Sequence, residues 1–339
     1  MFRKWILALL VCGTPIVVWS QRGGDVAYSF LSLPSSAKAA AMGNAALLPL
    51  HNDVNQAAHM PALLDSALHK QVAVNYANFF TQAHYVQAST AWHSPRWGTF
   101  AATVQNFNYG SFVKTNDLGG EEGNFYANEI AVMGHYAQQF SPVLHVGITV
   151  KVLLSQLEHY TSWGLAMDVA CRYQSLDRLT NVAFVVKNAG AQLSTYYAGS
   201  ERQPLPLNVQ LALSHKLAAA PFGISLTINH LQNWHLYQSS QTVQLLNNNN
   251  AAESGWSKAG KELLSHLAIG LGLYPSPKFF VMAGYNFLID NELRDETRRA
   301  GSGLSVGGGI RIKRTELCYS WGGYNVAGGA HSVSLLIQL

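Results

Sequence analysis

Charge is scarce in this chain: Asp, Glu, Lys and Arg make up 12% of its 339 residues, against about 25% in an ordinary soluble domain. Long apolar runs are missing too. After residue 20 there is no stretch of roughly 18 apolar residues that would cross a bilayer as a helix, although apolar residues reach 48%. Low charge without apolar helices indicates a closed membrane barrel, because only helices and closed barrels satisfy every backbone polar group in hydrocarbon.

Cysteine is also rare, with three in the chain. Cys12 lies in a predicted signal peptide, and Cys171 and Cys318 are predicted on opposite faces of the barrel wall. Side chains on opposite faces cannot form a disulfide without backbone movement, so we expect two free thiols. The 13 histidines are scattered without a pair at metal-ligand spacing. We therefore predict no metal site and no cofactor.

Residues 1–20 have the pattern of a secretory signal peptide. Arg3 and Lys4 form the basic start, residues 5–18 the apolar centre, and Val18-Trp19-Ser20 a cleavage site. A retained anchor is the alternative, disfavoured because Pro15 interrupts a short apolar run. Loss of the two basic residues lowers the formal charge from +4 to about +2, which gives no support for nucleic-acid binding.

From residue 71 onward the side chains alternate between apolar and small or polar, the period of a transmembrane β-strand. In the first such segment Val72, Val74 and Tyr76 alternate with small or polar neighbours. About fourteen segments of this kind predict an all-β, antiparallel transmembrane barrel. They are 71–80, the segment after a turn at 81–82, 96–107, 124–137, 143–155, 160–174, 180–189, 204–216, 222–233, 263–274, 277–288, 302–313, 315–321 and 330–339.

The connections alternate in length as such a barrel requires, with short periplasmic turns and longer external loops. The links 81–82 and 156–159 are short exceptions among the external ones. The periplasmic links are 94–95, 138–142, 175–179, 217–221, 275–276 and 314. The remaining external links are 108–123, 190–203, 234–262, 289–301 and 322–329. This pattern predicts an outer-membrane protein of a Gram-negative bacterium.

Residues 21–70 do not alternate and predict short helices. Ser35 or Ser36 fits the N-cap of an alanine-rich helix that Gly43-Asn44 ends. Further helical turns are predicted after Asn52-Asp53 and at Pro61. We expect 1–20 to be a signal peptide, 21–70 a plug inside or below the barrel, and 71–339 the barrel. A soluble N-terminal lead is the alternative for 21–70.

Charges and aromatic residues fall at distinct places on the predicted wall. Pairing that stiffens the wall is favoured over a selectivity site for the inward charges. These charges are Glu129, Lys151, Asp168, Arg172, Lys187, Arg311, Lys313 and Glu316. Aromatic residues near strand ends suit interfacial girdles; these are Trp92, Trp97, Trp163, Tyr274 and Trp321.

One catalytic pattern occurs and is rejected. Residues 35–38 match the Ser-x-x-Lys nucleophile pattern of penicillin-binding enzymes, which is expected by chance in a serine-rich chain. The supporting motifs are missing, because Asn116 follows Lys114-Thr115 and no Ser-Asp-Asn occurs. We predict a non-enzymatic protein without catalytic residues.

The segment Tyr28-Ser-Phe-Leu-Ser-Leu-Pro-Ser-Ser-Ala-Lys-Ala-Ala-Ala-Met-Gly43 resembles the opening of the PorV/PorQ family of type IX secretion system barrels. Those barrels are relatives of FadL-like fatty-acid channels. Asp53-Val54-Asn55 and Pro61-Ala62-Leu63-Leu64 fall where the family has its Asp-containing and Asn-Pro-Ala stretches, with Met60 in place of the usual Asn. The motifs cover about forty residues, and the chain length is closer to PorQ-type members than to PorV.

The resemblance implies a non-enzymatic component of the attachment complex. Such a barrel would hold a PorZ-like surface protein beside PorU- and PorV-like proteins, which process cargo and couple it to anionic lipopolysaccharide. The loops 108–123, 190–203, 234–262 and 289–301 are the expected docking surface. Candidate contact residues in them are Trp234, Tyr237, Trp256, Asp290 and Arg294.

A FadL-like transporter of hydrophobic small molecules is the rival hypothesis. It requires an apolar pocket between plug and wall and a lateral opening, for which Gly307-Gly308-Gly309 is the candidate. Glycines also mark bulges in barrels without transport. A barrel with a purely structural role is the third possibility.

Overall fold

A closed barrel of 14 antiparallel strands makes up most of the chain, and its first strand, β1, pairs with its last, β14. The computed structural model describes residues 26–49, 53–79, 82–116, 119–197, 199–234, 236, 255–293, 302–325 and 328–339. The predicted signal peptide at 1–20 lies outside these residues. No helix in the described part of the chain is long and apolar enough to cross a membrane.

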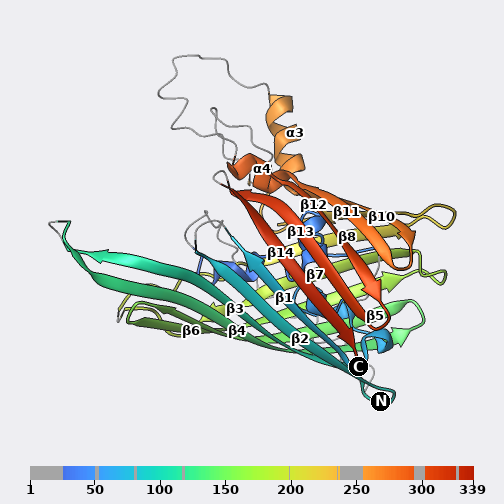
Figure 1. Cartoon of the computed structure of the whole chain (residues 1–339), viewed down its shortest axis with the longest axis horizontal. Coiled ribbons are helices and arrows are strands. Elements are labelled where there is room, and N and C mark those ends of the chain that lie inside the picture. The colour runs from blue at the N-terminus through green and yellow to red at the C-terminus, as the bar shows by residue number, and fades with distance from the viewer. Residues whose placement is uncertain are drawn as a thin grey trace.

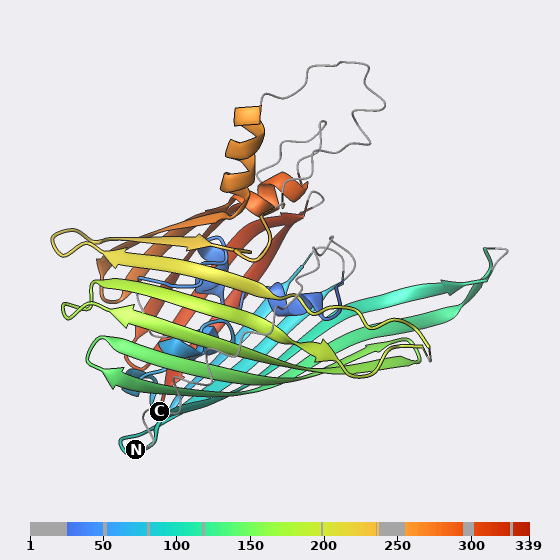
Figure 2. The same cartoon turned by 180° about the vertical axis from the view of Figure 1, so that it is seen from behind.

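Every strand pairs with its sequence neighbours, so the barrel is an up-and-down meander (Figures 1 and 2). The strands are β1 Gln71–Asn78, β2 His84–Ser94, β3 Gly98–Thr115, β4 Glu121–Ser141, β5 Leu144–Leu157, β6 Tyr160–Gln174, β7 Thr180–Gln192, β8 Asn208–Lys216, β9 Phe222–Ile228, β10 Leu267–Ser276, β11 Phe279–Asn286, β12 Leu304–Ile312, β13 Thr315–Asn325 and β14 Gly328–Gln338. The predicted fold class is confirmed.

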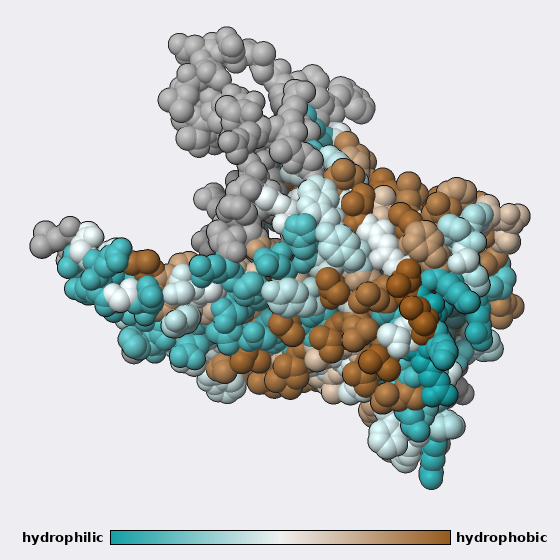
Figure 3. Space-filling model, in the orientation of Figure 1, coloured by the Kyte–Doolittle hydropathy of each residue, from teal (hydrophilic) through white to brown (hydrophobic). Residues whose placement is uncertain are grey.

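The alternating side chains point to the outside and the inside of the barrel in turn, as predicted. On β5, Val150, Val152 and Leu154 are exposed on the outside, whereas Lys151 and Leu153 are buried inside. Figure 3 shows apolar side chains gathered over the outer face of the wall. An apolar exterior around a closed ladder of backbone hydrogen bonds is what a lipid-facing barrel needs.

The largest difference from the prediction lies in residues 108–123, which are not a loop. Strands β3 and β4 continue through them as a two-stranded ribbon, in which Phe112 pairs with Phe125. We call residues 111–115 and 121–126 the external arm; they project beyond the neighbouring strands (Figure 2). The prediction ended the strand at 107 because the apolar alternation stops there. A ribbon that does not face lipid does not require apolar side chains on alternate positions.

Other predicted external loops also contain regular structure. The segment 234–262 leads into helix α3, Gly255–Ser265, and 289–301 begins inside helix α4, Phe287–Leu293. Most of 322–329 belongs to β13 and β14. Helices α3 and α4 contact each other at the external end of the barrel (Figure 1).

The N-terminal residues 26–49 and 53–70, called the plug below, lie inside the barrel as short helical turns. Helix α1, Ala37–Ala41, begins where the Ser36 hydroxyl accepts a hydrogen bond from Ala39 N at 3.3 Å. It ends before Gly43 and Asn44, both of which have positive φ. The other turns are η2 Ser29–Ser32, η3 Val54–Ala58, η4 Pro61–Leu63 and η5 Ser66–Leu68.

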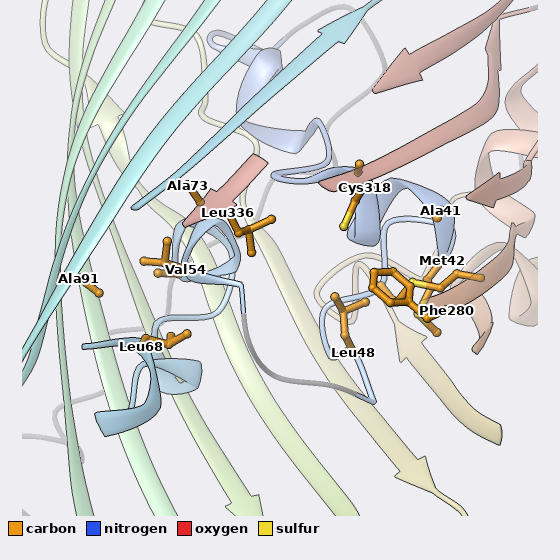
Figure 4. Packing of buried hydrophobic residues seen from close by; sticks show 14 of the residues in the cluster. Ala41, Met42, Leu48, Val54, Leu68, Ala73, Ala91, Phe280, Cys318 and Leu336 are labelled. Atoms are coloured by element: carbon orange, nitrogen blue, oxygen red, sulfur yellow. The ribbon is translucent and has the colours of Figure 1, made fainter. Parts of the chain in front are cut away.

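Small side chains on the inner wall make room for this plug. Met42 and Ala41 of the plug pack against Phe280 and Cys318 of the wall, and Val54 lies near Ala73 (Figure 4). Wall glycines allow a closer approach. A Cβ atom on Gly270 would lie 2.7 Å from the Met42 side chain, and one on Gly284 would overlap the Met42 backbone. Plug and wall are therefore in van der Waals contact.

Wall side chains also complete the hydrogen bonding of the irregular plug backbone. The hydroxyl of Ser334 accepts from Ala37 N at 2.8 Å, and that of Ser305 accepts from Gly43 N at 3.0 Å. Gln87 Nε2 donates to Asn55 O at 2.8 Å. Non-helical backbone at membrane depth is tolerated where protein groups satisfy it, so these contacts explain how the plug stays inside.

The glycine contacts predict a stability effect. Gly284→Val forces its new side chain into the Met42 backbone and should lower the free energy of unfolding by about 1–3 kcal/mol. The temperature at which the barrel loses heat-modifiable migration in detergent gels measures this. Gly134→Val is the matched control, since a Cβ there has no atom within 4 Å; equal losses in both variants would contradict the packing.

Candidate functional sites in the lumen and at the external end

A buried ionic contact joins the plug to the wall. Lys38 of α1 forms an ion pair with Glu316 of β13, and both side chains are almost fully buried. Arg311 Nε donates to the other Glu316 oxygen at 2.9 Å. The carboxylate therefore lies between two cations, which offsets the cost of burying it. Helix α1 is fixed to the wall by this contact.

A second buried group lies on β5, β6 and β7. Lys151 Nζ is 2.7 Å from Asp168 Oδ2 and donates to Asn188 Oδ1, also at 2.7 Å. Asp168 Oδ1 accepts from Asn188 N, at a bulge in the β6–β7 register. Lys187 is buried beside this group. The bulge turns the Asn188 backbone toward Asp168, so the wall pairs its own charges here.

Arg172 is held more loosely. Its guanidinium is fully buried, and the Asp65 carboxylate of the plug lies 3.7 Å away, beyond hydrogen-bond distance. His145 is its register neighbour on β5. This side of the plug therefore lacks the close ionic contact that fixes α1.

Five of the eight inward charges named from the sequence fall into three separate groups. Arg311 and Glu316 lie together, Lys151 and Asp168 lie together, and Arg172 is separate. The plug partners Lys38 and Asp65 were not named as their partners. Lys38 and Asp65 are charged residues in an otherwise weakly charged plug, and this was the sequence signal that could have identified them as partners of the wall charges.

Two wall assignments are wrong, and a third differs in depth. Lys313 is exposed in the β12–β13 turn with positive φ, where it lines the mouth of the barrel beside Gln71 and Arg311. Tyr274 is buried against Phe280 and belongs to no girdle. Gly307-Gly308-Gly309 keeps an unbroken register with β11 and β13 and forms no lateral opening. Those glycines make room for Ala41 and Phe280 instead.

The cysteines and the rejected catalytic pattern have simple structural roles. Cys171 is exposed, Cys318 is buried, and neither forms a disulfide, as predicted. Lys38, the lysine of the Ser-x-x-Lys pattern, forms the ion pair with Glu316 described above. No group of three potential metal ligands occurs among the residues that the structure describes.

Two of the candidate partner-contact residues, Trp234 and Asp290, are described together with their side chains, and both lie at the external end. Trp234 is 56% exposed, and its ring lies 5.1 Å from that of His266. Asp290 lies in α4 and accepts a hydrogen bond from Ser302 Oγ at 3.3 Å. Tyr237 and Arg294 lie outside the described residues, as does the side chain of Trp256 in α3.

The external arm also carries exposed aromatic residues at this end. Phe112 stacks on Phe125 with ring centroids 5.2 Å apart, and Tyr126 is 63% exposed. Within the arm, Lys114 Nζ lies 2.7 Å from Glu158 Oε1 of the β5–β6 turn. The hydrogen bond from Lys114 holds the pKa of Glu158 below its usual value. Figure 3 shows the arm as mostly hydrophilic.

Several solved structures have a similar fold. The chain is similar to the Pseudomonas putida toluene transporter TodX, with a TM-score of 0.53 and 12% identity over 90% of this chain and 97% of that one. A Pseudomonas aeruginosa FadL homologue gives 0.52 and 12%, over 91% and 99%. The CymD monoaromatic hydrocarbon channel gives 0.53 and 11%, over 91% and 98%. At such low identity these likenesses establish the fold.

Sequence comparison adds nothing to this. No protein-family model matches the chain, and no curated protein matches it.

The Lys38–Glu316 contact predicts how firmly the plug is held. Glu316→Gln leaves the Lys38 ammonium buried beside a neutral amide and should destabilise the protein by about 3–5 kcal/mol. The double variant Lys38→Met, Glu316→Leu should recover part of that loss, because the buried ammonium is removed while the buried Asp53 carboxylate near Lys38 stays. Thermal unfolding in detergent, followed by circular dichroism, measures both.

Glu158→Gln is the control for this pair. It removes the carboxylate from an exposed ion pair and should change the unfolding temperature far less. A double variant as unstable as Glu316→Gln alone would contradict the electrostatic explanation.

Proposed function

We propose that this protein is a non-enzymatic outer-membrane anchor of a type IX secretion attachment complex, holding a PorZ-like surface protein beside PorU- and PorV-like proteins. The observation that carries the proposal is that the N-terminal motif is packed and ion-paired inside the barrel. Residues 28–43 supply the core of a plug whose Lys38 is ion-paired to Glu316. A barrel filled in this manner is suited to a static role.

The packing of the plug supports an anchor. Leu47, Met60 and Ala62 are fully buried against the wall, and wall glycines admit the plug backbone at contact distance. Ser and Gln side chains of the wall satisfy plug backbone groups. Movement of any substrate past the plug would require these contacts to break together.

The external arm supports partner binding. It projects past strands β2 and β5 and exposes Phe112, Val113 and Tyr126. Exposed aromatic side chains on a projecting element are typical of interaction surfaces. We propose the arm together with Trp234 and the α3–α4 pair as the docking surface; Tyr237, Trp256, Asp290 and Arg294 remain candidate contacts within it.

A second function, transport of a hydrophobic small molecule, is favoured by the fold likeness, which points to it more directly than to secretion. The similar structures include a toluene transporter and a monoaromatic hydrocarbon channel. Fold alone does not determine function. In this chain the buried but loosely contacted Arg172 identifies the side of the plug that would have to move.

Shortening the arm tests the anchor. Replacing residues 111–126 by a short Gly-Ser turn removes the ribbon beyond the last pairs with β2 and β5. Tagged barrel extracted from its own outer membranes in mild detergent should then lose a PorZ-like partner that the unchanged protein retains. Leu176→Ser, at an 80% exposed position in a periplasmic turn, should retain it. Retention by the shortened variant would contradict docking through the arm.

Transport has a separate test. Liposomes containing the barrel should take up a radiolabelled monoaromatic hydrocarbon faster than empty liposomes if the second function holds. Under the anchor proposal, the uptake rates are equal. A plug displaced by Glu316→Gln should raise uptake only if the lumen is the route.

A further inference from the structure

The outer face of the barrel has a polar strip at its external end. Asn78, His84, Asn108, Asn128 and Gln156 are consecutive register partners on β1, β2, β3, β4 and β5. All five alternate with buried residues and therefore point outward. Five neighbouring strands thus present one continuous row of amide and imidazole groups on the outside.

The strip borders the apolar part of the wall. Moving along each strand toward the periplasm, the next outward residues on β2, β4 and β5 are Val86, Ile130 and Leu154. On β3 the next residue is Asn106, whose amide donates to Asn128 at 2.8 Å. Hydrocarbon chains that cover the apolar residues must end near the strip, so the headgroups of the outer leaflet meet it.

Two concave regions lie directly on the strip, one on each side of the arm base. The first has a volume of about 500 Å³ and is lined by Tyr76, His84, Asn108 and Tyr126, among others. The second, of about 430 Å³, is lined by Asn128, Gln156 and again Tyr126. Volumes of this size suit a small ligand, and the shared Tyr126 makes the pair one continuous surface.

The chemistry of this lining suits neutral sugars. Asn and Gln side chains both donate and accept hydrogen bonds, which matches hydroxyl groups. Tyr76 and Tyr126 are 42% and 63% exposed, and their faces offer an apolar surface beside a polar tip. The His84 ring is oriented by Tyr76, whose hydroxyl lies 2.8 Å from Nδ1.

The charges argue against a phosphate as the recognised group. Phosphate sites use Arg or Lys, whereas the strip has neither. Lys114, which lines the second region, is ion-paired with Glu158 at 2.7 Å, and Glu122 adds a further carboxylate. The local charge is therefore neutral to negative.

We infer that the polar strip with its two concave regions binds the uncharged sugars of a glycolipid headgroup in the outer leaflet. The bilayer holds the lipid part against the apolar wall, and the strip hydrogen-bonds the sugars next to it. Tyr126 lies between the two regions and contacts sugars in both. This inference depends on the barrel spanning an outer membrane and not on whether it anchors a partner or transports a substrate.

Native mass spectrometry of the full-length barrel tests the inference. The detergent-purified protein is mixed with equal amounts of a diglycosyl diacylglycerol, whose sugars are uncharged, and of the same diacylglycerol without sugars. We expect retention of the sugar-bearing lipid to exceed that of the sugar-free lipid by about tenfold. The triple variant Asn108→Ala, Asn128→Ala, Gln156→Ala should retain both equally.

A second triple variant is the control. Thr90→Ala, Gln138→Ala, Gln174→Ala changes outer-face or turn-proximal positions at the periplasmic end and should keep the preference. Tyr126→Ala, at an exposed arm position that cannot disrupt the wall, should reduce the preference severalfold even if the triple variant fails to fold.

Equal retention of the two lipids by the unchanged protein would overturn the inference, as would a preference that survives Tyr126→Ala. A free disaccharide headgroup that binds as tightly as the intact glycolipid would overturn the lipid-anchored site.

Discussion

Backbone hydrogen bonding is the constraint on which the rest of this structure depends. In hydrocarbon every N–H and C=O group must find a protein partner, and the pairing of β1 with β14 removes the last free sheet edge. The same requirement acts inside the barrel, where the plug has no long helix. Side chains such as Ser305 and Gln87 supply its missing partners, so wall and plug form one hydrogen-bonded unit.

The composition of the inner wall follows from the plug. A wall that must accept a chain segment needs small inward residues, and Ala73, Gly270 and Gly284 occupy such positions. Charges are kept to a few places where partners exist, as with Lys38 and Glu316. The contact of Arg172 with Asp65 is longer, so the plug is held less firmly on that side than on the side of Lys38.

The external end of the barrel is under different physical constraints from the lipid-facing wall. Beyond the strip that includes Asn108 and Asn128, the strands no longer face hydrocarbon, and β3 and β4 continue alone as a ribbon. A ribbon of this kind needs no apolar outer side. It is free to carry binding chemistry, and both the partner surface and the sugar site proposed here use it.

The sequence by itself determined the barrel, because a period of two, low charge and alternating link lengths are local properties of the chain. It also placed a helix cap at Ser35 or Ser36, of which the structure uses Ser36, and it separated Cys171 from Cys318, since capping and strand faces are local as well. Tertiary structure alone decided which charges meet. Lys38 and Glu316 are 278 positions apart in the numbering, and only barrel closure around the plug joins them. The arm, the burial of Tyr274 and the intact ladder at Gly307–Gly309 depend on pairing and packing with adjacent strands, which a period of two does not specify.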